Sequence, residues 1–394
     1  MAQSEVVVLS GVRTAIGTYG GSLKGKHPTE LGAAVVSEAV KRATIKPEEV
    51  GHVVFGSAIP TDTRDIYLAR VAAVNGGLPV KTPAFTLNRL CGSGLQAIVS
   101  AAQLIAMGDA SVTVAGGAEV MSGGPYWDTA TRWGQRLGDT SLIDSVLGGL
   151  TDPFGNGHMG VTAENVAEKH DISREAQDEL ALQSNQRAAA AIKAGYFKEQ
   201  ILPIEYTVKS KTVVFDTDEH VKPDTTLEKL AKLPPAFKAN GTVTAGNASG
   251  MNDAAAAVVL MDESLAQQRG LQPLGRLVGY AFAGVEPKYM GVGPIPAVKK
   301  VMERTGLTVQ DMDTIELNEA FAAQAIAVIR ELDLPMERTN PNGSGISLGH
   351  PVGATGCILV VKALYELRRI GGKYALVTLC IGGGQGIAAI FEAM

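Results

Sequence analysis

Residues 93–117 read SGLQAIVSAAQLIAMGDASVTVAGG. The alanine-rich stretch from Ser93 to Met107 predicts a helix, and Gly108-Asp109 is a suitable place for it to stop. The next run, Ser111 to Ala115, is short and apolar and lies between turn residues, so it predicts a buried strand. A helix followed at once by a buried strand is typical of crossover units, and we therefore expect an α/β fold with mainly parallel strands.

The same order of elements recurs near the C-terminus. In the first copy a polar turn with a reactive residue, Cys91, precedes the helix. In the second copy a glycine-rich approach leads to His350, and a helix to Arg369 and a strand from Tyr374 to Leu379 follow. Both strands run into a group of glycines. This recurrence predicts two structurally similar halves.

The middle of the chain has a different composition. It holds both tryptophans, a charged helical stretch from Ser173 to Ala194, and a polar stretch from Lys209 to Pro235. Such a shift indicates an inserted domain. We predict an N-terminal half formed by residues 1–120 and 251–272, an inserted loop domain at 121–250, and a C-terminal half at 273–394. Further strands are expected at residues 5–10, 52–57, 255–261 and 314–317, and a helix at 29–42.

Charge and composition exclude several function classes. The net charge is −5 and no basic block is longer than a pair, so no nucleic-acid surface is expected. No run approaches the roughly 18 apolar residues of a membrane span, and the N-terminus lacks the basic start of a secretory signal. We therefore expect a cytoplasmic protein without a membrane partner. The chain has three cysteines, which is a small and an odd number, so no disulfide framework is expected.

Two ligand motifs are also set aside. Gly20 to Lys26 comes close to a phosphate-binding P-loop, but His27 stands where the motif needs Ser or Thr. The glycines at 382–386 lack the dinucleotide-binding spacing. The histidines and cysteines show no ligand-pair spacing, so no metal is expected.

Cys91 lies in the stretch Asn88-Arg89-Leu90-Cys91-Gly92-Ser93-Gly94-Leu95, at a turn from strand to helix. A helix N-terminus presents unpaired amides and the positive end of the helix dipole, and both stabilise a thiolate. A free thiol with a pKa of about 8.5 is only slightly ionised near neutrality, so this position would favour a nucleophile. For a lone cysteine, a place in the apolar core is the commoner reading.

Three more polar groups lie at the ends of other strands. His350 is flanked by Gly349 and Pro351, in a backbone that can approach a ligand closely. Cys380 ends a strand and leads into glycines whose amides can face a developing negative charge. Asn318 can hold a water or donate to an oxyanion, while Glu319 can support the first turn of a helix; taken alone, helix capping is the better reading of both. Cys357 lies among apolar residues and is expected to be a packing residue.

Together these four motifs, in this order, resemble the thiolase family from residue 6 to residue 392. The resemblance implies a layered αβαβα fold with two similar halves and an inserted loop domain. It implies that Cys91 becomes acylated, that His350 takes its proton, and that Cys380 moves a proton at the substrate α-carbon. It further implies one oxyanion hole from His350 and a water held by Asn318, and another from the amides of Cys91 and Gly382.

The resemblance also implies the substrates. Thiolases catalyse reversible Claisen condensation of acyl-CoA molecules by ping-pong acyl transfer, with coenzyme A thioesters as substrates and no other cofactor. A homotetramer is expected, with part of its contacts in the inserted segment. By position, the CoA contacts would be Leu150, His158, Met159, Lys222, Phe237, Ala245, Ser249, Met290 and Phe321.

The sequence departs from the thiolase pattern at two places, and two other functions are weighed against it. Ser344 stands where many thiolases have glycine, and residues 57–70 differ from the segment common in acetoacetyl-CoA thiolases, which leads us to expect acceptance of acyl groups longer than acetyl. Lys222 stands where biosynthetic relatives often have arginine, so it would meet a phosphate as a point charge. The alternatives are a ketoacyl-synthase-type enzyme, whose two histidines do not fit Cys380, and a noncatalytic acyl-CoA-binding relative, which does not fit the intact Cys91, His350 and Cys380.

Overall fold

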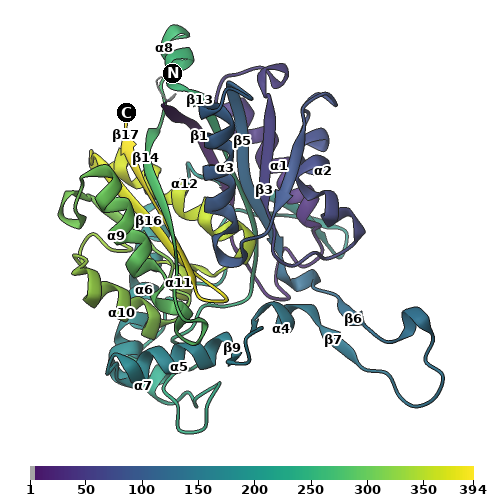
Figure 1. Ribbon diagram of the computed structural model, residues 1–394, viewed down its shortest axis with the longest axis vertical. Coiled ribbons are helices and arrows are strands. Elements are labelled where there is room, and N and C mark those ends of the chain that lie inside the picture. The colour runs from purple at the N-terminus through teal and green to yellow at the C-terminus, as the bar shows by residue number, and fades with distance from the viewer. Residues whose placement is uncertain (1–4) are drawn as a thin grey trace.

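The computed structural model describes residues 5–394, which build one long mixed sheet covered by helices (Figure 1). The strand order along this sheet is β15-β16-β17-β14-β1-β13-β5-β3-β4, and the short strands β2 (Gly17–Thr18) and β10 (Ile201–Leu202) pair with β13 and β1. The main strands are β1 (Val6–Thr14), β3 (His52–Gly56), β4 (Ala84–Leu87), β5 (Val112–Val120), β13 (Asn252–Asp262), β14 (Gly275–Gly284), β15 (Thr314–Leu317), β16 (Tyr374–Ile381) and β17 (Gln385–Ala393).

The sheet consists of two halves with the same strand order and directions. In β1-β13-β5-β3 the successive pairs are antiparallel, antiparallel and parallel, and β14-β17-β16-β15 repeats this pattern. The halves join where β1 meets β14, through the pairs Val7 with Arg276 and Val8 with Gly275. Two similar halves were expected from the recurring motif order. The residue boundaries of the three domains stay a prediction.

The expectation of mainly parallel strands is wrong. Parallel pairing is confined to β3 with β4 and β5, β15 with β16, and β1 with β10. Helices still bury the strands on both faces, so their composition resembles that of a parallel sheet. Gly383 and Gly384 have φ of 78° and 84° and form the turn that folds β17 back beside β16. That backbone region favours glycine, and the hairpin makes the pair antiparallel.

The helices form three layers around the two halves of the sheet (Figure 1). Helices α1 (Pro28–Arg42) and α2 (Leu68–Asn75) cover the N-terminal half, and α9 (Pro294–Thr305) covers β14 and β17. Helix α10 (Ala322–Leu332) packs beside α9. Between the halves lie α3 (Ser93–Ala106) and α12 (Val352–Ile370), and α12 contacts β5 and β13 on one side and β15 and β16 on the other. This is the layered αβαβα arrangement that the sequence predicts.

The two central helices cross with almost no space between them. A Cβ on Gly94 would lie 2.6 Å from the amide nitrogen of Cys357, and one on Gly356 would lie 2.3 Å from that of Leu95. Only glycine allows backbones to approach this closely. The crossing fixes the N-termini of α3 and α12 relative to each other. Cys91 and His350 each lie just before one of these N-termini.

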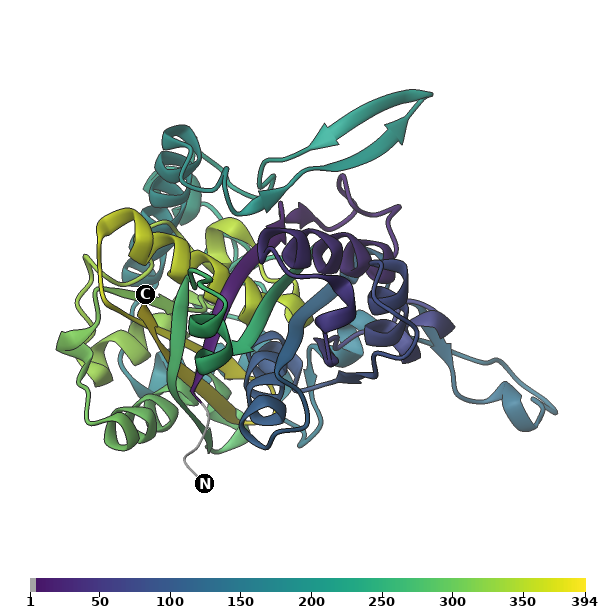
Figure 2. The same cartoon turned by 90° about the horizontal axis from the view of Figure 1, so that it is seen from above.

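The inserted segment packs against both halves and sends out two hairpins. It contains α4 (Ser145–Gly149), α5 (Met159–Lys169), α6 (Arg174–Ala194) and α7 (Leu227–Ala231), and the short pair β8 (Thr151–Asp152) and β9 (Gly157–His158). Hairpins β6–β7 (Tyr126–Asp128, Leu142–Asp144) and β11–β12 (Ile204–Val208, Lys211–Phe215) project from the body (Figure 2). Strand β12 falls in the polar stretch that begins at Lys209.

A buried ion pair fastens the insertion to the sheet. Arg13 on β1 donates from both terminal nitrogens to Asp218, at 2.7 and 2.9 Å. Such a bidentate pair is directional, so it holds the polar segment before α7 in one place. Between residues 5 and 394, no helix combines the length and apolar character needed to cross a bilayer. The cytoplasmic location stays a prediction.

Candidate functional site

Cys91 lies in the tight turn between β4 and α3. The side chain of Asn88 accepts a hydrogen bond from the amide of Leu90 at 2.8 Å, and Leu90 has a positive φ of 47°. The hydroxyl of Ser93 accepts from the amide of Arg89 at 2.8 Å and donates to the carbonyl of Leu90 at 2.7 Å. Local side chains thus hold the turn in a conformation that is rare for a non-glycine residue. The thiol is presented at the N-terminus of α3, as the sequence predicts.

The surroundings of Cys91 keep its thiol neutral in the resting protein. It remains partly accessible and packs against Ile59, Met121 and Val352. Burial raises the pKa of the Cys91 thiol to about 11, while the main-chain N–H groups of Gly382 and of Cys91 itself act to lower that pKa. Those two amides are the ones named above as an oxyanion hole. An anion at this position would find donors already in place.

The ring of His350 is held in one tautomer by its neighbours. Its amide donates to the side-chain oxygen of Asn252 at 2.8 Å, and its Nδ1 lies 2.7 Å from Thr355 Oγ1. The Thr355 hydroxyl already donates to the carbonyl of Pro351 at 2.8 Å, so it accepts the proton of Nδ1. Nε2 therefore carries the lone pair. Burial lowers the pKa of His350 to about 4, so the ring is neutral near pH 7 and can accept a proton.

Asn318 reaches the same ring from the end of β15. Its Nδ2 donates to His350 Nε2 across a long 3.4 Å. Its Oδ1 is buried and has no hydrogen-bond partner among the described residues. A buried amide oxygen normally has a partner, and a bound water supplies one where the protein does not. This arrangement fits the predicted role of Asn318 as the holder of a water beside His350.

Cys380 lies near the end of β16, and the turn that carries Cys91 packs against this strand. Cys380 is fully buried, against Met159, Met290 and Phe321. The two cysteines therefore border one site. Burial raises the pKa of the Cys380 thiol, and a charge on Cys91 raises that pKa further. A thiolate formed at Cys380 would be a strong base, because its conjugate acid holds the proton tightly.

Most of the predicted CoA contacts surround the two cysteines. Met159, Met290 and Phe321 pack with Cys380, and Leu150 packs in the cluster around Cys91. The His158 ring stacks on Phe237 at 4.7 Å between centroids, and Phe237 meets Phe321 edge-on at 6.2 Å. The amide of Ser249 donates to the carbonyl of Ala320 at 2.9 Å, next to Phe321. These residues form one apolar wall.

Two predicted CoA contacts lie outside this wall. Lys222 and Ala245 are exposed, and neither belongs to the clusters around the two cysteines. Lys222 has no ion pair with another of residues 5–394. An exposed lysine without an ion pair is suited to bind a phosphate at the outer end of a long ligand. It is less suited to contact the reacting end of that ligand.

The residues that hold the predicted catalytic side chains were not foreseen from the sequence. Thr355 and Asn252 fix the ring and the backbone of His350. Glu319 is no helix cap: its buried carboxylate accepts from Ser184 at 2.6 Å and from Asn340 at 2.9 Å. Thr355 lies five residues after His350, and a threonine in the apolar first turn of the predicted helix was the available signal. The other partners come from distant parts of the chain and carry no local pattern.

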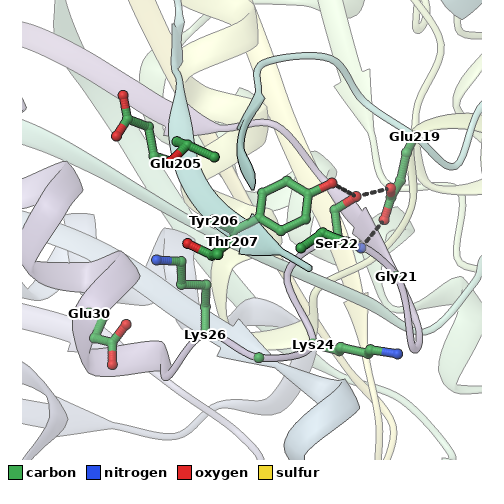
Figure 3. Close-up of a pocket in the computed structure, with 12 residues that line it drawn as sticks. Gly21, Ser22, Lys24, Lys26, Glu30, Glu205, Tyr206, Thr207 and Glu219 are labelled. Atoms are coloured by element: carbon green, nitrogen blue, oxygen red, sulfur yellow. Dashed lines mark hydrogen bonds between the residues drawn. The ribbon is translucent and has the colours of Figure 1, made fainter. Parts of the chain in front are cut away.

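A cavity of about 770 Å³ lies away from these residues, between the loop at 21–26 and hairpin β11–β12 (Figure 3). This loop is the stretch that resembles a P-loop. Its amides are already in use: those of Gly21, Lys24 and Lys26 donate to main-chain carbonyls, and that of Ser22 donates to Glu219 at 3.0 Å. These N–H groups are not free to bind a phosphate, which argues against the P-loop reading.

His27, Asp62 and Asp65 bring three ligand-type atoms within 4.8 Å of one another. His27 Nδ1 lies 3.2 Å from the amide nitrogen and 2.6 Å from Oγ1 of Thr29. His27 Nε2 lies 3.1 Å from Asp62 Oδ2 and 3.5 Å from Asp65 Oδ1. These contacts join the three side chains to one another and to the start of α1. The absence of a metal stays a prediction.

Fold and site together define an enzyme that transfers acyl groups through a cysteine. Residues 6–264 match the family model described as "Thiolase, N-terminal domain", and residues 271–393 match "Thiolase, C-terminal domain". The chain belongs to the thiolase family. It is an acyltransferase, of the class that makes and breaks carbon-carbon bonds by Claisen condensation and thiolysis.

Individual relatives cover the whole chain. The beta-ketothiolase BktB of Cupriavidus necator is 64% identical over 389 residues, which are 98% of this chain and 99% of that protein. The crystal structure of the Bacillus anthracis acetyl-CoA acetyltransferase has a TM-score of 0.98 at 49% identity and covers all of both chains. Human mitochondrial 3-ketoacyl-CoA thiolase in complex with CoA has a TM-score of 0.96 at 47% identity and covers 100% of this chain and 98% of its own.

Proposed function

We propose that this thiolase acts on short-chain acyl-CoA substrates, with Cys91 as the acyl carrier, His350 as its base and Cys380 as the acid and base at the α-carbon. Asn318 holds a water that forms one oxyanion hole with His350. The amides of Cys91 and Gly382 form the other. No cofactor besides the coenzyme A of the substrates takes part.

The first half-reaction loads the acyl group onto Cys91. As the thiol attacks the thioester carbon, His350 Nε2 takes its proton, so charge develops only during the attack. The amides of Cys91 and Gly382 receive the oxyanion. The bond from carbon to CoA sulfur breaks, and the leaving CoA thiolate takes the proton of Cys380. This step leaves an acyl-Cys91, a protonated His350 and a Cys380 thiolate.

The second half-reaction uses that thiolate. Cys380 removes a proton from the α-carbon of acetyl-CoA, and the resulting carbanion attacks the acyl-Cys91 carbonyl. A carbon-carbon bond forms, the bond to Cys91 sulfur breaks, and Cys91 recovers its proton from His350. The α-proton is poorly acidic, so the enolate needs donors in place, each worth about 10² to 10³ in rate. The His350–Asn318 pair supplies such a site.

One observation carries this proposal: the turn that bears Cys91 packs against β16, near whose end Cys380 lies, and against α12, which follows His350. The His350 ring is held with its Nδ1 proton on Thr355, so Nε2 keeps its lone pair. A ketoacyl-synthase-type site would need a second histidine where Cys380 lies. A noncatalytic relative would not need a Thr355 that fixes the base tautomer. Human mitochondrial 3-ketoacyl-CoA thiolase has been solved with CoA, which supports placing CoA along the wall around Met159 and Phe237.

The purified protein should thiolyse both acetoacetyl-CoA and 3-ketovaleryl-CoA. We expect kcat/KM values within about tenfold of each other, because one extra methylene changes discrimination by about that factor. Loss of absorbance of the ketoacyl-CoA enolate at alkaline pH reports the rate. Turnover of acetoacetyl-CoA alone would restrict the enzyme to acetyl transfer, and turnover of neither would refute the proposal.

We also propose that the protein is a homotetramer and that hairpin β6–β7 is part of its contacts. The tip of this hairpin exposes 92% of Trp133 and 93% of Leu137, and Tyr126 and Leu142 on its strands are exposed as well. Large apolar side chains on a projecting segment are typical of a surface that another subunit covers. A second copy of the chain has the symmetry to do so.

Replacing Trp133 and Leu137 by Asp should therefore convert the tetramer into a smaller species. Multi-angle light scattering gives the mass directly. A matched control replaces Val208 and Val214 by Asp, which places the same two charges on exposed positions of the other projecting hairpin and should leave the mass unchanged. A wild-type monomer, or a tetramer that survives both substitutions, would contradict the proposal.

A further inference from the structure

Glu119, near the end of β5, is a buried carboxylate that accepts hydrogen bonds from two separate segments. Its Oε2 accepts from the amides of Ala58 at 2.9 Å and Gly353 at 2.7 Å. Its Oε1 accepts from the amide of Ile59 at 3.1 Å and from the hydroxyl of Ser57 at 3.3 Å. None of its surface is exposed. The mechanism above makes no use of this group.

Both segments border the acyl carrier. Ala58 and Ile59 pack in the same cluster as Cys91, and so does Val352, next to Gly353. The amide of Gly353 belongs to the first turn of α12, three residues after His350. One carboxylate therefore links the wall beside the nucleophile to the segment that carries its base.

The Glu119 carboxylate has no cation to balance it. Among residues 5–394, no Lys, Arg or His forms an ion pair with it, so amide dipoles and the N-terminus of α12 are what stabilise its charge. Burial raises the pKa of Glu119 to about 7 against the effect of its hydrogen bonds. Its negative charge also raises the pKa of Cys91, so the two groups are close enough to interact.

A structural glutamate alone would not need this location. A negative charge beside a cysteine nucleophile opposes thiolate formation, so its presence needs another reason. The reason that the contacts suggest is position: the carboxylate is the acceptor shared by Ala58, Ile59 and Gly353, and an amide side chain could not satisfy all three N–H groups.

We propose that Glu119 is a positioning residue that fixes the Ala58–Ile59 wall at a set distance from Cys91, and that this wall limits the size of the acyl group carried there. The proposal rests on the acyl-carrier role of Cys91 proposed above. In the thiolysis of 3-ketovaleryl-CoA, Cys91 carries a propionyl group in place of acetyl. The wall would then meet the extra methylene.

Glu119→Gln tests the hydrogen bonds and the negative charge of the carboxylate together. Its NH₂ group turns a donor toward a main-chain N–H, so at least one amide of the wall loses its acceptor and the wall moves. We expect the ratio of kcat/KM for 3-ketovaleryl-CoA to that for acetoacetyl-CoA to rise at least about fivefold, within the range that one methylene controls. Removal of the charge should also move the pH profile of Cys91 alkylation by iodoacetamide to lower pH.

Glu119→Asp separates position from charge. It keeps the negative charge and is shorter by one methylene, so the substrate ratio should change while the alkylation profile stays close to that of the wild type. The matched control is Asp313→Asn, where a carboxylate that accepts from the amides of Lys373 and Tyr374 lies at the opposite end of β15 and β16. It should change neither readout.

An unchanged substrate ratio in folded Glu119→Gln and Glu119→Asp would overturn the proposal, and so would failure of both variants to fold, since the carboxylate would then serve stability. Wild-type protein that turns over neither substrate would instead refute the proposed function. The alkylation profile needs no acyl-CoA and reports the charge of Glu119 in either case.

Discussion

Cys91→Ala should lower kcat for thiolysis of acetoacetyl-CoA by a factor of at least about 10⁴, the scale of loss when a covalent nucleophile is removed. The alanine leaves the amides of residue 91 and Gly382 in place, so substrate binding should persist and KM should change little. The turn itself is held by Asn88 and Ser93, whose hydrogen bonds do not involve the thiol. Steady-state kinetics with a binding measurement for CoA checks both expectations.

The third cysteine gives a matched control. Cys357 is fully buried in α12, and burial raises the pKa of its thiol, so it has no route to substrate. Cys357→Ala should keep kcat within about threefold, at a cost in stability of about 1 kcal/mol for the small cavity. Equal losses in the Cys91 and Cys357 variants would show that packing explains the effect. Near-normal turnover by Cys91→Ala would show that Cys91 is not the nucleophile.

Cys380→Ser should separate the two half-reactions. A serine hydroxyl is far less acidic than a thiol, so it cannot be left as the anion that removes the α-proton. We expect condensation of acetyl-CoA, and exchange of its methyl protons in deuterated water, to fall at least about 10²-fold, the usual contribution of a general base. Acyl transfer to Cys91 should be reduced much less.

Two readouts on the same sample make this test decisive. Proton exchange is followed by NMR of the acetyl methyl group, and transfer to Cys91 by the burst of free CoA. An equal loss of both would show that Cys380 serves the whole site and would remove its assigned role. If only the CoA burst were lost, Cys380 would be needed for the acylation of Cys91 and not for removal of the α-proton.

The sequence predicted individual elements well because their signals are local. Helix α1 begins at Pro28, one residue before its predicted start, and ends at the predicted Arg42, and β15 has the predicted bounds from Thr314 to Leu317. Strand direction was mispredicted because it depends on which distant strand pairs with which. β13 lies between β1 and β5 in the sheet, although more than a hundred residues separate it from β5 in the chain. No pattern in its own sequence indicates its direction.

The residues of the candidate site also differ in whether a local sequence signal marks them. Cys91, His350 and Cys380 were found because glycines lie close to each of them in a recognisable motif. In the structure the turn with Cys91 packs against β16 and α12, and Asn318 contacts His350. Asn252 and Glu119 were missed because their roles come from contacts that span 98 and 234 positions of the chain. Their own neighbours in sequence are ordinary strand residues. Only the three-dimensional arrangement shows what they hold.

Cys91 is proposed to carry the acyl group, and every other step depends on this role. Mass spectrometry of peptides from protein quenched in acid after mixing with acetyl-CoA tests it. We expect one acetyl group on the peptide that contains Cys91, retained in Cys380→Ser and absent from Cys91→Ala. Acetylation of Cys380 or Cys357 in the wild-type protein, or turnover without any acetylated peptide, would contradict it.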